Sequence, residues 1–338
     1  AMIEGHGDDI YRYGDKVRYN FSSNLYQMAD HSGLMKALYG GGDIFSTYPE
    51  PAPFSLEAAL SEEHSVPSNC VVATNGATEA IYLAAFMLSG KRSAIVSPTF
   101  SEYEDACKIY GHTIARFSCI NDIPEADAVW ICNPNNPDGK AYSRDTLLEV
   151  VDRHPATLFV VDLAYHNYSA TKPLLAADAV VRKNLILLYS MTKDFSVPGL
   201  RIGYAVSSEQ IATRLRGLKM PWSVNSVALK AAAYLLKNKD LYKIPLQELL
   251  SEAARVKDAL KSLGIEVSDS DANFMLCRLP NGSAADLKSF LIESDGILIR
   301  DASNFAGLTP SHFRIAVQSR EMNDILLQNI TKWSSFCR

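Results

Sequence analysis

The chain has 338 residues, of which 47% are hydrophobic and 21% are charged, a composition typical of a globular protein with a sizeable core. Its 33 Lys and Arg against 38 Asp and Glu leave a net charge of −5, which argues against a surface for nucleic acid or an anionic membrane. The longest apolar run, residues 80–88, is too short for the roughly 20 residues of a membrane span, and residues 3–9 are too polar for a signal peptide, so we expect a cytoplasmic protein.

Between residues 70 and 206, short apolar runs alternate with stretches of helical spacing. Apolar runs of four to six residues without polar alternation are typical of strands that are buried on both faces. The predicted strands are 70–74, 94–97, 128–132, 158–161, 185–189 and 202–206, and the predicted helices between them are 78–88, 101–110 and 143–153. Ser143 is the expected N-cap of the last of these helices. This alternation predicts an α/β fold with a mostly parallel sheet.

The pattern changes after residue 207. The remaining predicted helices are 209–218, 225–237, 241–263, 284–293 and one from residue 321, and the remaining predicted strands are 274–278, 297–300 and 313–317. Because this mixture is typical of an α+β unit, we predict a large domain at 41–240 and a smaller one at 241–338. Residues 1–40 contain no convincing long element, and we expect them to pack with the small domain or across a dimer interface.

The segment 189–204 carries the most chemical information. Lys193 follows an apolar strand, with Ser190 three residues before it and Arg201 eight residues after it. Ligands usually bind beyond the carboxyl ends of strands in α/β sheets. A desolvated lysine beside another cation can form a Schiff base, and Ser190 and Arg201 could then hold a phosphate. A solvated surface lysine is the usual alternative, but the apolar flanks and the spacing together argue against it.

Three other strand ends favour the same chemistry. After strand 70–74 the chain opens a helix, so the backbone N–H groups of Gly76, Ala77 and Thr78 could bind a phosphate. Asn136 lies in an amide-rich turn after strand 128–132, which by itself would be read as a plain polar turn. Asp162 ends a fully apolar strand, where a carboxylate is costly unless it meets a cation such as a protonated pyridine nitrogen.

Taken together, these motifs resemble a known family. Lys193 with its Ser and Arg, Asn136 before Pro137, and the Asp-x-Ala-Tyr motif at 162–165 resemble the fold-type I pyridoxal-phosphate (PLP) enzymes, and more narrowly the class I/II aminotransferases. The resemblance covers nearly the whole chain, with the motifs in the family's order and spacing. It implies PLP as the cofactor, no metal, and a homodimer with shared active sites.

The resemblance also implies a role for each matching residue. Lys193 would bind PLP covalently and shuttle the proton, while Asp162 would pair with the pyridinium nitrogen. Asn136 and Tyr165 would bind the phenolic oxygen of the ring, and Phe100 would stack on its face. The cofactor phosphate would be held by Ala77, Thr78, Ser190, Arg201 and, from the neighbouring subunit, Tyr48. Arg314 would bind the α-carboxylate of the substrate.

Within this family the chain is similar to two groups that act on small phosphorylated amines, the L-threonine-O-3-phosphate decarboxylases and the histidinol-phosphate aminotransferases. Both imply that Arg300 lies near the substrate phosphate. Segments 21–24, 100–103, 219–225 and 304–308 look more like the decarboxylases, which adds Asn24 and the backbone near His6 and Gly7 to the phosphate site. Tyr165 instead matches the aminotransferases.

The favoured function is therefore decarboxylation of L-threonine O-3-phosphate, as in cobalamin synthesis, and a histidinol-phosphate-type aminotransferase is the alternative. A PLP-fold protein that binds its ligand without turnover is a third reading. The presence of Lys193, Asp162 and Arg201 argues against that third reading.

Overall fold

The computed structural model describes residues 8–40 and 44–336, and its largest element is a seven-stranded mixed sheet in the order β2-β8-β7-β6-β5-β3-β4. Strands β3 to β7 are parallel to one another, and β8 runs antiparallel to both of its neighbours. The strands are β2 (Val71–Thr74), β3 (Arg92–Val96), β4 (Thr113–Phe117), β5 (Ala128–Cys132), β6 (Leu158–Asp162), β7 (Leu185–Ser190) and β8 (Gly203–Ser207). The α/β fold with a mostly parallel sheet is confirmed.

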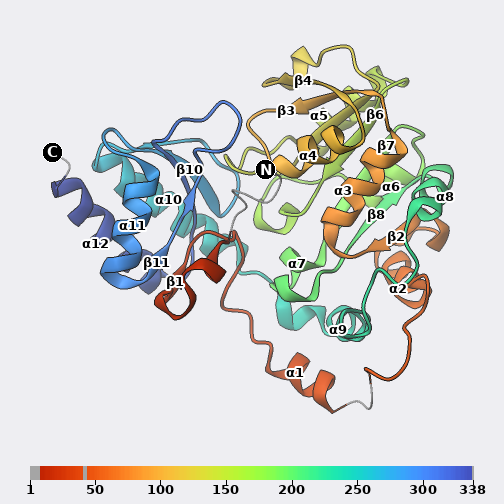
Figure 1. Cartoon of the computed structure of the whole chain (residues 1–338), viewed down its shortest axis with the longest axis horizontal. Coiled ribbons are helices and arrows are strands. Elements are labelled where there is room, and N and C mark those ends of the chain that lie inside the picture. The colour runs from red at the N-terminus through yellow and green to blue at the C-terminus, as the bar shows by residue number, and fades with distance from the viewer. Residues whose placement is uncertain (1–7, 41–43, 337–338) are drawn as a thin grey trace.

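Helices cover both faces of this sheet (Figure 1). One face packs against α3 (Gly76–Met87), α4 (Ser101–Ile109) and α8 (Glu209–Leu218). The other face packs against α2 (Phe54–His64), α5 (Arg144–Arg153), α6 (Ala176–Val180) and α9 (Ser226–Lys237). Because β5 to β8 are buried on both sides, their sequences are continuous apolar runs rather than alternating ones.

The C-terminal part of the chain forms a separate antiparallel sheet in the order β12-β13-β10-β9. Its strands are β9 (Glu266–Val267), β10 (Phe274–Arg278), β12 (Arg300–Asp301) and β13 (His312–Ala316). The helices beside it are α10 (Leu246–Ser262), α11 (Ala284–Asp295) and α12 (Arg320–Phe336). These elements lie together on one side of the molecule in Figure 1.

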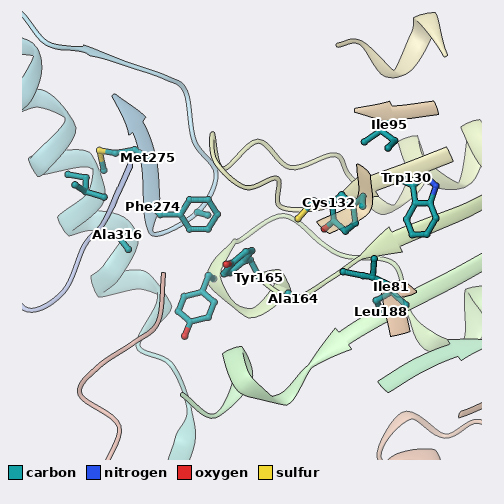
Figure 2. Close-up of a cluster of buried hydrophobic side chains, with 14 of the residues drawn as sticks. Ile81, Ile95, Trp130, Cys132, Ala164, Tyr165, Leu188, Phe274, Met275 and Ala316 are labelled. Carbon is teal, nitrogen blue, oxygen red and sulfur yellow. The ribbon is translucent and has the colours of Figure 1, made fainter. Parts of the chain in front are cut away.

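The N-terminal segment joins both parts. Strand β1 (Tyr19–Asn20) pairs in parallel with β11 (Ile297–Leu298), next to the small sheet, and α1 (Ser32–Tyr39) contacts α9 beside the large sheet. A single apolar cluster also runs between the sheets (Figure 2), where Tyr165 packs edge-on against Phe274 with ring centroids 4.9 Å apart. The domain boundaries at residues 40 and 240 remain a prediction.

Several predicted elements differ from the structure. The helix expected at 241–263 begins only at Leu246, because Pro245 cannot donate a backbone hydrogen bond, and residues 239–242 form a short 3₁₀ helix. The strand expected at 297–300 is two short strands that pair with different partners. Helices α1 and α2 and the edge strand β4 were not predicted; β4 is mostly exposed and therefore lacks the apolar run of a buried strand.

No helix in residues 8–40 and 44–336 is long and apolar enough to cross a membrane.

Candidate active site

A cavity of about 790 Å³ opens at the carboxyl ends of the parallel strands, between the large sheet and the small one. The last residues of β5, β6 and β7, which are Cys132, Asp162 and Ser190, all line it. Most of the site residues predicted from the sequence line the same cavity: Ala77, Thr78, Phe100, Asn136, Asp162, Tyr165, Ser190, Lys193, Arg201, Arg300 and Arg314.

Lys193 lies in the short helix α7 (Met191–Asp194) directly after β7. Its Nζ donates a hydrogen bond to the backbone oxygen of Ser23 at 3.1 Å and lies 5.3 Å from the centre of the Tyr165 ring. The amine therefore faces the cavity between β7 and the N-terminal segment, with an aromatic ring beside it.

Asp162 is a buried carboxylate whose two hydrogen-bond donors are neutral groups. Its Oδ2 accepts from the Tyr103 hydroxyl at 2.7 Å, and its Oδ1 accepts from the Ala164 backbone N–H at 2.9 Å. Burial raises the pKa of Asp162 above its ordinary value, because the charged form has lost its hydration. Both oxygens are thus fixed in position. A buried carboxylate is costly unless it is paired, so a cation bound in the cavity would stabilise it. The sequence prediction did not assign Tyr103 this contact.

A compact turn surrounds the N-terminus of α3. Gly76 has a φ of +71°, and a Cβ at this position would lie only 2.7 Å from Nη2 of Arg201. A Cβ at Gly203 in β8 would lie 2.4 Å from the backbone nitrogen of Ala77. These glycines let Arg201 and β8 approach the first turn of α3, where unpaired N–H groups favour an anion. Ser190 is buried beside them.

Arg300 and Arg314 are both buried, and they are opposite one another on β12 and β13. Burial lowers the pKa of Arg314 to about 10, and it also lowers the pKa of Arg300. Arg314 donates to the side-chain oxygen of Asn136 and to the backbone oxygen of Ser22, whereas its Nε has no partner among the described residues. Arg300 donates to Asn304 Oδ1 at 2.8 Å.

Three of the predicted residues that the structure describes do not line the cavity. Tyr48 is 86% exposed and contacts the ring of Trp222. Asn24 is fully buried with a φ of +60°, and its side-chain amide has no hydrogen-bond partner in the described part of the chain. Gly76 does not line the cavity itself but leaves room for the Arg201 side chain, which does. His6 and Gly7 lie outside the described residues.

The fold and this site define the class of the protein. The family model for class I and II aminotransferases matches residues 19–330, and the chain belongs to that family. The chain is 31% identical over 325 residues to the threonine-phosphate decarboxylase of Salmonella typhimurium, covering 91% of this chain and 89% of that one. It is also 31% identical over 307 residues to the histidinol-phosphate aminotransferase of Caldanaerobacter subterraneus subsp. tengcongensis, covering 85% of each chain.

A solved structure is also similar. It is that of L-threonine-O-3-phosphate decarboxylase from Porphyromonas gingivalis, with a TM-score of 0.92 and 36% identity over 94% of this chain and 99% of that one.

Membership of this family makes the chain a PLP-dependent enzyme. The residues present fit that cofactor, because the cavity contains an amine, a buried carboxylate that needs a cation, and an anion site at the start of a helix. Those are the three groups that a pyridine aldehyde phosphate requires.

Proposed function

We propose that this enzyme decarboxylates L-threonine O-3-phosphate to aminopropanol phosphate, releasing the α-carboxylate as carbon dioxide and placing a proton on the same carbon. When bound, PLP supplies an electron sink for the pair of electrons that the broken bond leaves behind. The decarboxylase of P. gingivalis, at 36% identity and nearly full coverage, supports this choice.

The facing arginines support a substrate with two anionic groups. Two cations directly opposite on neighbouring strands destabilise a sheet, and burial makes their charges costlier still. A substrate with two anionic groups close together offsets that cost. Threonine phosphate has a carboxylate and a phosphate on adjacent carbons, whereas histidinol phosphate has a phosphate and no carboxylate. We assign Arg314 to the carboxylate and Arg300 to the phosphate, with Asn24, His6 and Gly7 completing the phosphate site.

We assign the remaining roles from the family resemblance, and the position of these residues on the cavity wall supports them. Lys193 holds the cofactor and moves the proton at the substrate's α-carbon, while Asp162 neutralises the ring nitrogen. Asn136 and Tyr165 bind the ring oxygen, and Phe100 covers the ring face. Ala77, Thr78, Ser190 and Arg201 bind the cofactor phosphate, with Gly76 leaving room for Arg201.

Transamination of histidinol phosphate is the second candidate. The relative from C. subterraneus, which has the same 31% identity as the Salmonella decarboxylase over a somewhat shorter alignment, supports it. The amino donor glutamate also carries two carboxylates, so the arginine pair alone does not decide between the two reactions.

Replacing Arg300 with alanine tests the phosphate assignment. A charge-assisted contact contributes about 1.5–3 kcal/mol, so KM for threonine phosphate should rise roughly 10- to 150-fold. KM for unphosphorylated threonine should change little, because threonine lacks the group that Arg300 binds. Steady-state kinetics with both amino acids measure the difference.

Arg278→Ala is the matched control for Arg300→Ala, because Arg278 lies in the same sheet but is exposed and pairs with Glu266. It should leave both KM values within about twofold of wild type. An equal rise in both KM values for Arg300→Ala would remove Arg300 from the phosphate site.

We also propose a homodimer in which the partner's Tyr48 reaches the cofactor phosphate. Tyr48 contacts Trp222, and both rings are exposed. Phe45, three residues before Tyr48, and Met220, two residues before Trp222, are exposed as well. Such a concentration on the surface is typical of a protein–protein interface. The protein's cytoplasmic location remains a prediction from its sequence.

Mixed dimers test the shared site. A dimer of a Lys193→Ala subunit and a Tyr48→Phe subunit contains one intact site and should have about half of the wild-type activity when cofactor is limiting. Wild type mixed with the double variant Lys193→Ala/Tyr48→Phe is the control, because its only lysine-containing site lacks the tyrosine hydroxyl. If the two mixed dimers are equally active, Tyr48 does not act across the interface.

A further inference from the structure

Residues 21–27, which we call the N-terminal strap, run between the lysine helix α7 and strand β13. On one side, the backbone oxygens of Phe21 and Leu25 accept hydrogen bonds from Ala316 N and Gln318 Nε2. On the other side, Ser196 Oγ donates to the backbone oxygen of Tyr26 at 2.7 Å. The strap therefore lies against both walls of the cavity.

Two consecutive backbone carbonyls of the strap accept hydrogen bonds from the two cationic side chains to which we assign roles in the reaction. The Ser22 oxygen accepts from Arg314, and the Ser23 oxygen accepts from Lys193 Nζ. Carbonyls of neighbouring residues are only a few ångströms apart, so the strap restricts the distance between the proton-carrying amine and the guanidinium that would bind the carboxylate. A shift of the strap changes both contacts at once.

One buried hydroxyl connects the strap to the main chain of α7. Tyr168 ends the 3₁₀ helix η5 (His166–Tyr168) and is completely buried. Its hydroxyl accepts a hydrogen bond from the Tyr26 N–H at 3.0 Å and donates one to the Lys193 carbonyl at 3.0 Å. Tyr26 and Lys193 are far apart in sequence, and the Tyr168 hydroxyl connects the backbone of one to the backbone of the other.

We propose that Tyr168 is a positioning residue that holds the strap and the lysine helix in register, so that Lys193 is placed correctly relative to Arg314. The proposal rests on the assignment of Lys193 as the cofactor lysine in the proposed function. Phenylalanine at 168 would keep the buried ring but leave the Tyr26 N–H and the Lys193 carbonyl without that hydroxyl. Even a small displacement of a reacting group can lower the rate of an enzymatic reaction by a large factor.

Tyr168→Phe is the test, and it has three measurements. In the cofactor-free protein, hydrogen exchange at the Tyr26 amide should become at least about tenfold faster. In the loaded protein, the visible circular dichroism of the cofactor should change, because its surroundings depend on the placement of Lys193. With threonine phosphate, kcat per bound cofactor should fall about 10- to 100-fold, while KM changes less than about threefold.

Tyr204→Phe is the matched control. Tyr204 is also a buried tyrosine, but it belongs to the apolar cluster on the opposite face of the large sheet, and its hydroxyl pairs with His64. It should alter none of the three measurements. If Tyr168→Phe does not fold, 3-fluorotyrosine at position 168 is the second variant, because it keeps the shape of the side chain but makes the hydroxyl oxygen a weaker hydrogen-bond acceptor. It should change amide exchange, circular dichroism and kcat in the same direction, but by less.

Faster exchange at Tyr26 with an unchanged dichroism spectrum and unchanged kcat per cofactor would overturn the proposal, because Tyr168 would then only stabilise the fold. The exchange and dichroism measurements use no substrate. If threonine phosphate is not turned over, the proposed reaction fails while these two measurements still decide the role of Tyr168.

Discussion

Lys193→Ala is expected to abolish turnover, with a loss of at least about 10⁴-fold, while the protein folds normally. The other lysine among the described residues of the cavity wall, Lys108, lies on α4 and pairs with Glu104. Lys193 is therefore the amine that we expect to serve as both covalent anchor and proton carrier. The side chain is only half-buried and makes one hydrogen bond to Ser23, so its removal should cost little stability. Borohydride reduction of wild type should attach the cofactor to the peptide that contains Lys193, and mass spectrometry detects this.

Lys219 is the rival amine and provides the control. Burial lowers its pKa, which is what a reactive lysine needs, but Lys219 does not line the cavity. Lys219→Ala should therefore keep the borohydride label on Lys193. A label on the Lys219 peptide of wild type would show that the lysine has been assigned incorrectly.

The second large effect is expected from Asp162→Asn. Asparagine can present its oxygen to Ala164 N and its nitrogen to the Tyr103 hydroxyl, so the fold and cavity should persist without the charge. Losing a charge-assisted contact of about 1.5–3 kcal/mol to the ring nitrogen should lower kcat/KM roughly 10- to 150-fold. Kinetics at saturating cofactor measure this loss.

The same variant has an opposite effect on the stability of the cofactor-free protein. Burial raises the pKa of Asp162 in the folded state. Above a pH of about 4, this carboxyl group therefore holds its proton more in the folded state than in the unfolded state, and the free energy of unfolding falls as the pH rises. Asp162→Asn removes this loss, so without cofactor it should be more stable than wild type at pH 7. Equal stability of the two at pH 7, measured by urea unfolding, would contradict the account of Asp162 as a carboxylate that burial destabilises.

The sequence predicts those site residues that follow buried strands. The ends of β5, β6 and β7 are visible as the points where continuous apolar runs stop, and parallel strands bring these ends to one edge of the sheet. Asp162, Ser190 and Lys193 could therefore be placed together without a structure. Ser143 was likewise identifiable as an N-cap, and its hydroxyl accepts from Thr146 N.

Contacts that depend on strand register could not be predicted in this way. Arg300 and Arg314 face each other because β12 pairs with β13, whereas the sequence pattern joined β11 and β12 into one strand. The contacts of Tyr103 with Asp162 and of Tyr168 with Tyr26 join residues 59 and 142 positions apart. No local periodicity marks such pairs, since each tyrosine by itself is an ordinary core residue.

The most direct measurement is product analysis with two substrates in parallel. The loaded enzyme is given L-threonine O-3-phosphate alone, and separately histidinol phosphate with 2-oxoglutarate, and released carbon dioxide and formed glutamate are quantified. The account predicts carbon dioxide and aminopropanol phosphate in equal amounts from the first, and little glutamate from the second. Carbon dioxide release at the background rate, together with rapid formation of glutamate from histidinol phosphate, would contradict it.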